Sequence, residues 1–334
     1  MDYTFSNFVV GSSNRFAHAA ALAVANAPAE AYNPLLIYGK TGLGKTHLLQ
    51  AMTQYIQQRH PAWRTVYVSA EHFMRELLRA LQQGRTGAFQ EHYRRADVLL
   101  VDDVQFMVGR EHTQEAFLYT FDALHEARKQ IVLACDKAPQ ELAPLDVRLR
   151  SRLAAGLLTD IQAPDLDTRL AILTCKASER AILLPQEVAA LVASRIHTNI
   201  SDLEQGLTRI ATYASLQAQA INMSLAETVL QQIGAERARV LTPPRIQQLV
   251  AQHFHLKVSE LRSKKRHQSI ILPRQIAMFL CRECTDASLP EIGRQFGGRD
   301  HTTVLYACSK IARLEETDEN VAQQLAQLRR VLGQ

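Results

Sequence analysis

Hydrophobic residues in the first half of the chain form short continuous runs, and segments with helical spacing separate them. A continuous apolar run is typical of a strand that is covered on both faces of its sheet. Strands that alternate with helices through residue 160 predict a parallel α/β sheet. The runs that we expect to be strands are residues 35–38, 65–68, 96–101 and 131–135. The helices expected around them are residues 14–27, 45–58, 71–83 and 113–129.

The pattern changes beyond residue 160. From residue 167 to about residue 233 the apolar positions keep helical spacing without a strand signal, which predicts an all-helical lid of three or four helices. Pro243-Pro244 begins a further helix, and the rest of the chain again has helical spacing. The predicted domains are an α/β core (residues 1–163), the lid (164–233) and a connecting helix with an all-helical domain (234–334).

The composition is that of a globular protein, with 47% hydrophobic and 21% charged residues among 334. The net charge of +5 is unevenly distributed. Residues 237–334 hold 16 lysines and arginines against 9 aspartates and glutamates, whereas residues 1–236 hold 22 against 24. A basic end on a near-neutral body is typical of proteins that bind a polyanion.

Neither a signal-peptide pattern nor an apolar run of the length that a membrane helix needs is present in the sequence. The five cysteines are odd in number and scattered, which is typical of reduced thiols in a reducing compartment. We therefore expect a cytoplasmic location.

A glycine-rich segment follows the first predicted strand. Residues 39–46 match the phosphate-loop pattern G-x-x-x-x-G-K-[ST] between a strand and a helix. Its backbone N–H groups can turn towards phosphates, and the helix N-terminus adds partial positive charge. Lys45 is predicted to reach the β- and γ-phosphates of ATP, and the Thr46 hydroxyl to bind Mg²⁺. The alternative is a glycine-rich turn that binds nothing. The glycines of the predicted cradle are Gly39, Gly42 and Gly44.

Two adjacent carboxylates, Asp102 and Asp103, end the third predicted strand. Ligands of open α/β sheets bind at the carboxyl ends of the strands, so both side chains are expected beside the phosphates. We predict that Asp102 binds Mg²⁺ and that Asp103 orients or deprotonates the attacking water. Asp136 ends the next strand and is a candidate sensor of the γ-phosphate. The alternatives are a polar turn for the pair and a turn cap for Asp136.

Three arginines, Arg148, Arg150 and Arg152, follow the core strands within five residues. Such a cluster can be a solvated face. In an assembly driven by nucleotide, one guanidinium can instead contact a neighbour's γ-phosphate through two parallel hydrogen bonds, which lysine cannot do. That contact would couple ATP to the formation of an oligomer.

Residues 288–311 have the pattern of a helix-turn-helix. Ser288 and Glu291 form a capping box at the start of one helix, which ends at two glycines. A second helix begins at Asp300, a favourable N-cap residue. A plain helical hairpin is the alternative. The residues expected on the apolar side of the second helix are Val304, Leu305, Cys308 and Ile311.

The second helix of a helix-turn-helix presents its first residues to the major groove of DNA. Threonine methyl groups can pack on thymine methyl groups, while hydroxyl, imidazole and carboxylate groups can form hydrogen bonds with base edges. The residues predicted to contact duplex DNA here are Arg299, Asp300, His301, Thr302 and Thr303.

A basic segment, residues 262–269, precedes this motif and contains no acidic residue. Phosphate contacts from Lys264 would fix the register on the duplex, and Arg266 could enter a minor groove. The segment leads into Arg274 and Gln275 near the start of another helix.

Cys281 and Cys284 have the spacing of a zinc or redox pair. There is no second pair, and the same spacing places both thiols on one face of a helix. We favour core thiols over a metal or redox site.

These motifs together resemble one family, the bacterial chromosomal replication initiators known as DnaA. The resemblance rests on the phosphate loop, on the opening Tyr3-Thr4-Phe5 with residues 11–17, and on residues 101–106. Its most specific part is residues 289–304, with Leu-Pro-Glu-Ile-Gly followed by Phe-Gly-Gly-Arg-Asp-His-Thr-Thr-Val. It covers essentially the whole chain and does not extend to the N-terminal domain and linker by which that family recruits helicase and partner initiators.

The resemblance implies an AAA+ ATPase core with a helical lid and a DNA-binding domain. Proteins of this family bind short duplex repeats at the replication origin, form an ATP-dependent helical oligomer and melt adjacent AT-rich DNA. ATP, ADP and Mg²⁺ are the implied ligands, with weak ATP hydrolysis acting as a switch. Replicative helicase and acidic phospholipids are further implied partners, and the implied location is the nucleoid.

The resemblance also implies roles for individual residues. Arg148 matches an arginine finger between subunits, and Arg152 matches a second arginine that is important for the ATP-bound assembly. Leu78 and Arg110 match positions that contact single-stranded DNA within the filament. The positions that match duplex-reading residues are Arg266, Arg274, Gln275, Asp300, His301, Thr302 and Thr303.

The chain departs from the family pattern at two places. Residues 153–156 read Leu-Ala-Ala-Gly where the family has an aromatic and glycine-rich stretch. Ser201 stands where the family carries a sensor arginine in the lid. Because serine brings no positive charge to the phosphates, we expect nucleotide binding to survive while turnover, or the discrimination of ATP from ADP, weakens.

Two other functions fit parts of the sequence. A DNA-binding regulator that uses bound nucleotide as a static switch would bind ATP without measurable hydrolysis, as Ser201 would allow. An AAA+ helicase loader or transposition ATPase would share the core, but such chains generally lack a reader like residues 288–303. We therefore predict an ATP-dependent, sequence-specific initiator of chromosome replication.

Overall fold

The structure is a computed structural model of the chain, and it describes all residues except 1–2, 143–144, 240, 264–266, 286 and 333–334. For residues 235–239 and 268 it describes the backbone alone. The chain folds into two compact units, Met1–Gln231 and Gln232–Gln334.

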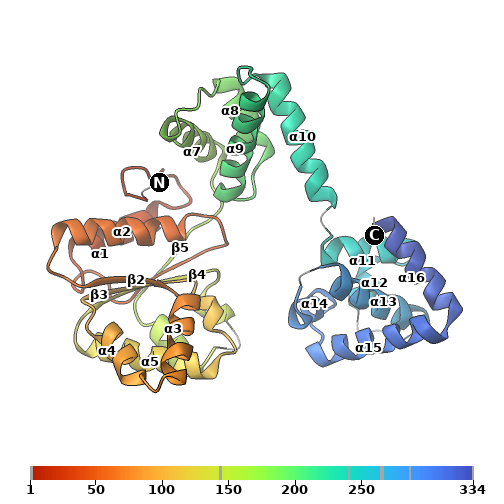
Figure 1. Ribbon diagram of the computed structural model, residues 1–334, viewed down its shortest axis with the longest axis horizontal. Helices are drawn as coiled ribbons and strands as arrows, with labels where there is room; N and C mark the ends of the chain where they lie inside the picture. Colours follow the sequence, from red (N-terminus) through yellow and green to blue (C-terminus); the bar gives the residue numbers. More distant parts are fainter. Residues whose placement is uncertain (1–2, 143–144, 240, 264–266, 286, 333–334) are drawn as a thin grey trace. The chain divides into compact units, whose positions relative to one another are not determined.

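A parallel sheet of five strands forms the centre of the described part of the first unit, in the order β2-β3-β4-β1-β5 (Figure 1). The strand before the phosphate loop, β1, pairs with β4 and β5, so that Leu35 lies opposite Val132 and Leu157. The strands are β1 (Leu35–Tyr38), β2 (Thr65–Ser69), β3 (Val98–Asp102), β4 (Gln130–Cys135) and β5 (Leu157–Asp160).

Four of these strands begin and end within two residues of their predicted bounds. The fifth, β5, is not among the predicted strands. Three of its four residues are only partly buried, because it lies at the edge of the sheet, and its sequence lacks the long apolar run of the central strands.

Helices cover both faces of the sheet (Figure 1). One face packs against α1 and α2, where alanines and leucines such as Ala21 and Leu48 are fully buried. The other face packs against helices that bring a cluster of aromatic rings, including Phe73 and Phe117. The helices of this layered core are α1 (Arg15–Asn26), α2 (Lys45–Arg59), α3 (Ala70–Gln82), α4 (Thr86–Arg94), α5 (Glu111–Glu126) and α6 (Val147–Leu153), with short 3₁₀ turns η1 (Val104–Met107) and η2 (Pro139–Glu141).

The predicted helices of the core lie within three residues of α1, α2, α3 and α5. Two short helices, α4 and α6, are not among the predictions. Gly84 ends α3 with φ +66°, and α4 begins two residues later with Gly87 in its first turn. Glycine weakens a helix, so this segment has no helical signal of its own and is held by Phe89 and Tyr93, which are buried against α3.

The lid consists of four helices, and no strand occurs in it within the described residues, as predicted. Asp165 caps α7 by accepting a hydrogen bond from the Thr168 backbone N–H. Asn199 caps α9 in the same way, through the Asp202 backbone N–H. The lid helices are α7 (Leu166–Glu179), α8 (Gln186–Arg195), α9 (Ile200–Leu216) and α10 (Met223–Arg239), of which α10 extends into the second unit.

The second unit is all helical in its described part and has its own core. Ile276, Leu280, Phe296 and Ile311 are fully buried there. Cys281 is also fully buried in this core. The helices are α11 (Pro243–His253), α12 (Val258–Arg262), α13 (Gln268–Cys284), α14 (Leu289–Gln295), α15 (His301–Thr317) and α16 (Glu319–Leu332).

The predicted apolar side of α15 is wrong at one position. Leu305 is 52% exposed, whereas Ala307 is 1% exposed and faces the core together with Val304 and Ile311. Residues four and three apart share a helix face, so Val304, Ala307 and Ile311 form a single stripe and Leu305 lies a quarter turn away from it.

Among the described residues, the structure contains no helix that combines the length and the apolar character needed to cross a membrane.

Candidate nucleotide site and nucleic-acid interface

The phosphate loop connects β1 to α2 with the backbone conformation that its glycines allow. Gly42 and Gly44 have φ values of +78° and +101°, which side chains other than glycine rarely adopt. Gly44 is the residue before α2, so the loop ends directly at a helix N-terminus. Gly39 is held close to the neighbouring strand, and a Cβ atom there would lie 2.3 Å from the Ile161 carbonyl oxygen. The sequence pattern thus folds into the strand–loop–helix arrangement that the motif requires.

The two polar residues at the start of α2 are held by the loop and by β3. Lys45 is 5% exposed, and its ammonium group donates hydrogen bonds to the carbonyls of Gly39 (2.7 Å) and Lys40 (3.1 Å). The Thr46 hydroxyl donates to Asp102 Oδ2 at 2.7 Å. The loop and the acidic strand end are therefore in direct contact.

Asp102 is the most enclosed acid of the site, at 2% exposure. Its carboxylate accepts hydrogen bonds from Thr46, from the Tyr67 hydroxyl (3.0 Å) and from the Asp103 backbone N–H (2.9 Å). Burial nevertheless raises the pKa of Asp102 above its ordinary value, and the neighbouring Asp103 charge adds to this. The threonine hydroxyl and the carboxylate are oxygen ligands of the kind that Mg²⁺ prefers, so the residues present fit that ion.

Asp103 and Asp136 are joined by Gln105, a residue outside the predicted nucleotide set. The Gln105 amide nitrogen donates to Asp103 Oδ1 at 2.8 Å, and its amide oxygen accepts from the Asp136 backbone N–H at 3.1 Å. Asp103 itself has a left-handed backbone, with φ +55°. This bridge fixes the ends of β3 and β4 beside each other. The only sequence signal for it is the position of Gln105, two residues after the acidic pair.

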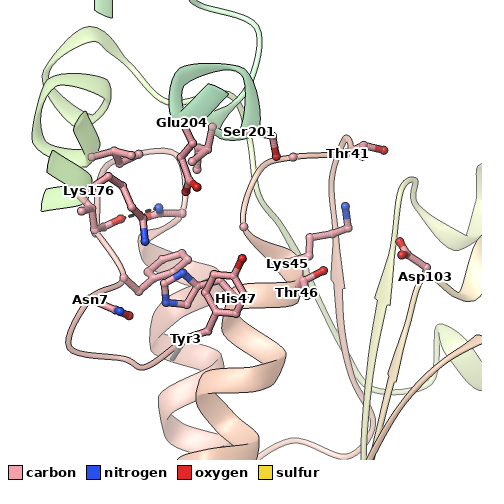
Figure 2. A pocket seen from close by; sticks show the side chains of 17 residues that line it. Tyr3, Asn7, Thr41, Lys45, Thr46, His47, Asp103, Lys176, Ser201 and Glu204 are labelled. Carbon is pink, nitrogen blue, oxygen red and sulfur yellow. Dashed lines mark hydrogen bonds between the residues drawn. The ribbon is translucent and has the colours of Figure 1, made fainter. Parts of the chain in front are cut away.

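These residues border two neighbouring hollows. Gly42, Gly44, Lys45, Thr46 and Asp103 line a cavity of about 330 Å³ between the core and the lid (Figure 2). Asp102 accepts a hydrogen bond from Thr46, which lines this cavity. Gly39 and Asp136 border the adjacent hollow together with Lys40 and Thr41, on the β4 side of the loop. The structure thus gathers all the predicted nucleotide residues around one loop.

The far side of the cavity is built by segments that carried no predicted site residue (Figure 2). The N-terminal segment contributes rings that pack on His47, with ring centroids of Tyr3 and Phe8 at 4.8 Å and 5.1 Å. Burial lowers the pKa of His47, and its Nε2 lies 2.9 Å from the Thr4 carbonyl oxygen. The lid contributes residues of α7 and α9. The cavity residues without a predicted role are Tyr3, Asn7, Phe8, Val9, Asn14, Thr41, His47, Ile172, Lys176, Ile200 and Glu204.

The lid contacts the phosphate loop at the start of α9. The backbone N–H groups of Ile200 and Ser201 lie 2.9 Å and 3.4 Å from the Gly42 carbonyl oxygen. Ser201 lines the cavity, so the position of the expected sensor residue does face the predicted phosphate site. Glu204, one turn later, forms an ion pair with Arg180 at 3.1 Å.

The two arginines with predicted roles in assembly lie on α6 with their side chains towards solvent. The Arg148 side chain is 72% exposed and lies 3.5 Å from Asp146, which also caps the helix. The Arg152 side chain is 51% exposed and pairs with Asp122 at 2.8 Å. Neither arginine lines the nucleotide cavity of its own chain. A residue that reaches a neighbouring subunit would have to point away from that cavity.

The positions expected to contact single-stranded DNA are also on the surface of the first unit. Leu78 is 50% exposed on α3, although it is a large apolar residue. Arg110 is exposed and directly precedes α5. Their role stays a prediction.

In the second unit, α14 and α15 form the predicted pair of helices joined by a tight turn. Ser288 and Glu291 form the capping box of α14, and Asp300 caps α15 through the Thr302 backbone N–H at 2.8 Å. The Asp300 oxygen also accepts from the Thr302 hydroxyl at 2.7 Å and lies 3.2 Å from His301 Nδ1. His301, Thr302 and Thr303 are exposed at the start of α15, where a major groove would be read.

Other predicted DNA contacts are placed differently. Arg274 is only 5% exposed, and its guanidinium donates to the carbonyls of Leu261 (2.6 Å) and Glu260 (2.9 Å) at the end of α12. Arg299 donates to the Ser263 carbonyl at 2.9 Å. Gln275 is partly buried, with an amide oxygen that has no partner among the described residues. Lys264 and Arg266 lie outside the described residues.

Comparisons with known proteins agree with this arrangement. The sequence models of the bacterial DnaA ATPase domain and of the bacterial DnaA helix-turn-helix match residues 1–160 and 243–311. A relative from Symbiobacterium thermophilum, named chromosomal replication initiator protein DnaA, is 50% identical over 327 residues, which are 98% of this chain and 71% of that protein.

Three solved structures that are similar to this chain are also DnaA proteins. Domain III of the Thermotoga maritima DnaA is 39% identical, with a TM-score of 0.67, and the match covers 69% of this chain and 96% of that one. AMPPCP-bound DnaA from Aquifex aeolicus is 32% identical, with a TM-score of 0.61 and coverage of 98% and 97%. A replication initiator DnaA bound to AMPPCP and single-stranded DNA is 33% identical, with a TM-score of 0.61 and coverage of 97% and 96%.

Proposed function

Because the chain belongs to the DnaA family of bacterial replication initiators, we propose that it binds short duplex repeats at the origin, assembles there with ATP and melts adjacent AT-rich DNA. The observation that carries this proposal is the presence of two sites in one polypeptide. One is a phosphate loop with an acidic strand end, and the other is a helix-turn-helix with exposed polar residues at the start of its second helix.

Nucleotide binding rests on the first site. Gly42 and Gly44 shape the loop, and Lys45 neutralises the β- and γ-phosphates. Thr46 and Asp102 hold Mg²⁺, which when bound neutralises phosphate charge. Asp103, fixed by Gln105, orients the attacking water, and Asp136 senses the γ-phosphate from the end of β4. Hydrolysis of ATP to ADP then acts as a slow switch, without the cation that a sensor arginine would bring.

Assembly rests on the exposed arginines of α6. Arg148 extends into solvent, and we propose that it contacts the γ-phosphate of ATP in the neighbouring subunit. Arg152 supports the same assembly. Since ADP has no γ-phosphate, the contact forms with ATP alone and makes the oligomer depend on the bound nucleotide.

DNA recognition is divided between the two units. We propose that His301, Thr302 and Thr303 read base edges of the duplex repeats, and that Leu78 and Arg110 contact the melted single strand. Arg299, Asp300 and the basic residues Lys264 and Arg266 orient the duplex. We assign residues 1–163 to the ATPase core, 164–233 to the lid and 234–334 to the connecting helix and DNA-binding domain. Replicative helicase and acidic phospholipids are proposed further partners, and the proposed location is the nucleoid in the cytoplasm.

The test is cooperative assembly on DNA that carries several copies of the repeat bound by DnaA relatives. Fluorescence anisotropy with ATP or ADP would be compared for the full chain, for Arg148→Ala and for Arg150→Ala, a matched arginine on the same helix. We expect cooperative binding with ATP that is lost in Arg148→Ala and kept in Arg150→Ala. Equal binding with ATP and ADP in the unmodified chain would contradict the proposal.

A further inference from the structure

The cavity of the nucleotide site has two chemically different ends. Lys45, Thr46 and Asp103 lie on one side, and Lys176, Asn7, His47 and Tyr3 lie on the other (Figure 2). The phosphate loop defines the first end. A nucleotide whose phosphates occupy that end would place its base at the second end, because the cavity continues from the loop to the lid.

The cavity also has apolar walls, which suit a planar base. Phe8 is 8% exposed, and Ile172 of α7 is 4% exposed, and both line the cavity together with Val9 and Ile200. Ligand sites are typically apolar with a few fixed polar groups that set specificity. The polar group that stands out at this end is Lys176.

Lys176 is a buried lysine of the lid. Its side chain is 7% exposed, and Glu179 Oε2 lies 3.0 Å from its ammonium nitrogen. An ammonium group has three N–H donors, and the described residues give this one a single acceptor. Buried polar donors are almost always satisfied, so the remaining N–H groups need acceptors in the cavity that Lys176 lines.

The ion pair holds the ammonium group in place. Glu179 also accepts a hydrogen bond from Asn7 of the N-terminal segment, and the nearby Lys176 ammonium and these hydrogen bonds keep the pKa of Glu179 below its ordinary value despite partial burial. Glu179 therefore stays ionised and fixes Lys176 between α7 and the N-terminal segment. Burial lowers the pKa of the neighbouring His47, so its imidazole is neutral at neutral pH and, among the described residues that line this end, Lys176 is the cation.

We propose that Lys176 determines base specificity by donating a hydrogen bond to a ring nitrogen of the bound purine. This inference rests on the proposed binding of ATP at the phosphate loop and adds a recognition residue to it. Purine bases offer N1, N3 and N7 as acceptors, and a fixed ammonium group in a site shielded from water favours a base that presents one of them. Ser201 of α9 brings no positive charge to the cavity. Among the described residues of the lid that line the cavity, Lys176 is the one that does.

The test compares ATP with 1-deaza-ATP, 3-deaza-ATP and 7-deaza-ATP, each of which replaces one ring nitrogen by C–H. Binding would be measured by calorimetry for the full chain and for Lys176→Met, which keeps the length and apolar stem of the side chain without the charge. We expect one analogue to bind the full chain about 10- to 100-fold more weakly than ATP, the range for one charged hydrogen bond. The same analogue and ATP should bind Lys176→Met with equal affinity.

Two results would overturn the proposal. One is that all three analogues bind the full chain as tightly as ATP, which needs no variant and so does not depend on whether Lys176→Met folds. The other is a deaza penalty of the same size in both proteins, with unchanged thermal melting of the variant without nucleotide. A full chain that binds no ATP would instead refute the proposed function, so the two failures are distinguishable.

Discussion

The backbone N–H of Ile200 donates a 2.9 Å hydrogen bond to the carbonyl oxygen of Gly42. This bond joins the first residue of α9 in the lid to the phosphate loop of the core. The phosphate loop and the start of α9 are closely packed, since a Cβ atom at Gly42 would lie 2.9 Å from Asn199 Oδ1 and 3.0 Å from Ser201 Oγ. The phosphate loop and the start of α9 are therefore in direct contact.

The first prediction uses the position of Ser201 beside this contact. Ser201→Arg should place a guanidinium at the phosphates and raise the preference for ATP over ADP by about tenfold, with faster hydrolysis, because a charged hydrogen bond to the γ-phosphate forms with ATP alone. Nucleotide affinities by calorimetry and phosphate release would measure the two effects.

Ser201→Ala is the matched control for this substitution. It removes the hydroxyl without adding charge and should leave both the nucleotide preference and the hydrolysis rate within about twofold of the unmodified chain. An equal response to alanine and arginine would mean that the start of α9 does not face the γ-phosphate.

The sequence predicts that the phosphate loop and the acidic strand end lie together, because each of these parts is local. Residues 39–46 form one loop, and Asp102 and Asp103 end one strand, so their meeting follows from the parallel sheet alone. The other end of the cavity could not be predicted in this way. Lys176 and Asn7 are 169 positions apart, and no pattern in either segment indicates that Glu179 joins them.

In the second unit, basic residues with the same predicted role differ in burial, and the composition of the sequence does not show this difference. Arg274 and His301 both belong to a predicted DNA-contacting set, but Arg274 is buried under the end of α12 and His301 is exposed. An arginine in a basic protein is expected at the surface. Only the packing of α12 against α13 shows that two backbone carbonyls need this guanidinium.

The second prediction follows from that difference. Arg274→Met should lower the free energy of unfolding by about 3 kcal/mol, because it leaves the buried carbonyls of Leu261 and Glu260 without their charged donor. His301→Ala should leave unfolding unchanged and cost about 1 to 3 kcal/mol of binding at one or two base pairs of the repeat. Urea unfolding of the full chain and anisotropy with single-base variants of the DNA would measure the two.

Stability unchanged in Arg274→Met, together with weaker binding to every DNA sequence, would assign this residue to phosphate contacts instead. The comparison with His301→Ala matters because both substitutions remove a basic side chain from the same unit.

The third prediction concerns the turn between α14 and α15. Gly297 and Gly298 both have left-handed backbones, with φ +85° and +72°. A Cβ atom at Gly297 would lie 2.1 Å from the Arg262 carbonyl oxygen, whereas one at Gly298 would meet nothing within 4 Å. Gly298→Ala should therefore cost about 1 kcal/mol of stability and Gly297→Ala about 3 kcal/mol or more.

Each glycine variant is a control for the other. Both positions have a left-handed backbone, but only Gly297 lies close to the Arg262 carbonyl oxygen. Denaturant unfolding of both would be compared with binding to the duplex repeat. If Gly297→Ala were no less stable than Gly298→Ala, the packing of the turn against the end of α12 would be refuted.

The fourth prediction is a pH dependence at the start of the lid. Hydrogen bonds from Thr168 and from the Ser12 hydroxyl, which lies 2.7 Å away, lower the pKa of Asp165 from 3.8 to about 2. A carboxylate whose pKa is lower in the folded state than in the unfolded state stabilises the fold at pH values above its unfolded pKa. The contribution of Asp165 is therefore complete above about pH 5 and is lost as the pH falls from about 4 towards 2.

Asparagine also caps helices but does not ionise in this range. The stability difference between the unmodified chain and Asp165→Asn, measured by urea unfolding between pH 7 and pH 2.5, should therefore be constant above about pH 5 and shrink below about pH 4. Ser12→Ala should weaken this pH dependence, and a difference that stays constant down to pH 2.5 would show that the carboxylate of Asp165 does not link the N-terminal segment to α7.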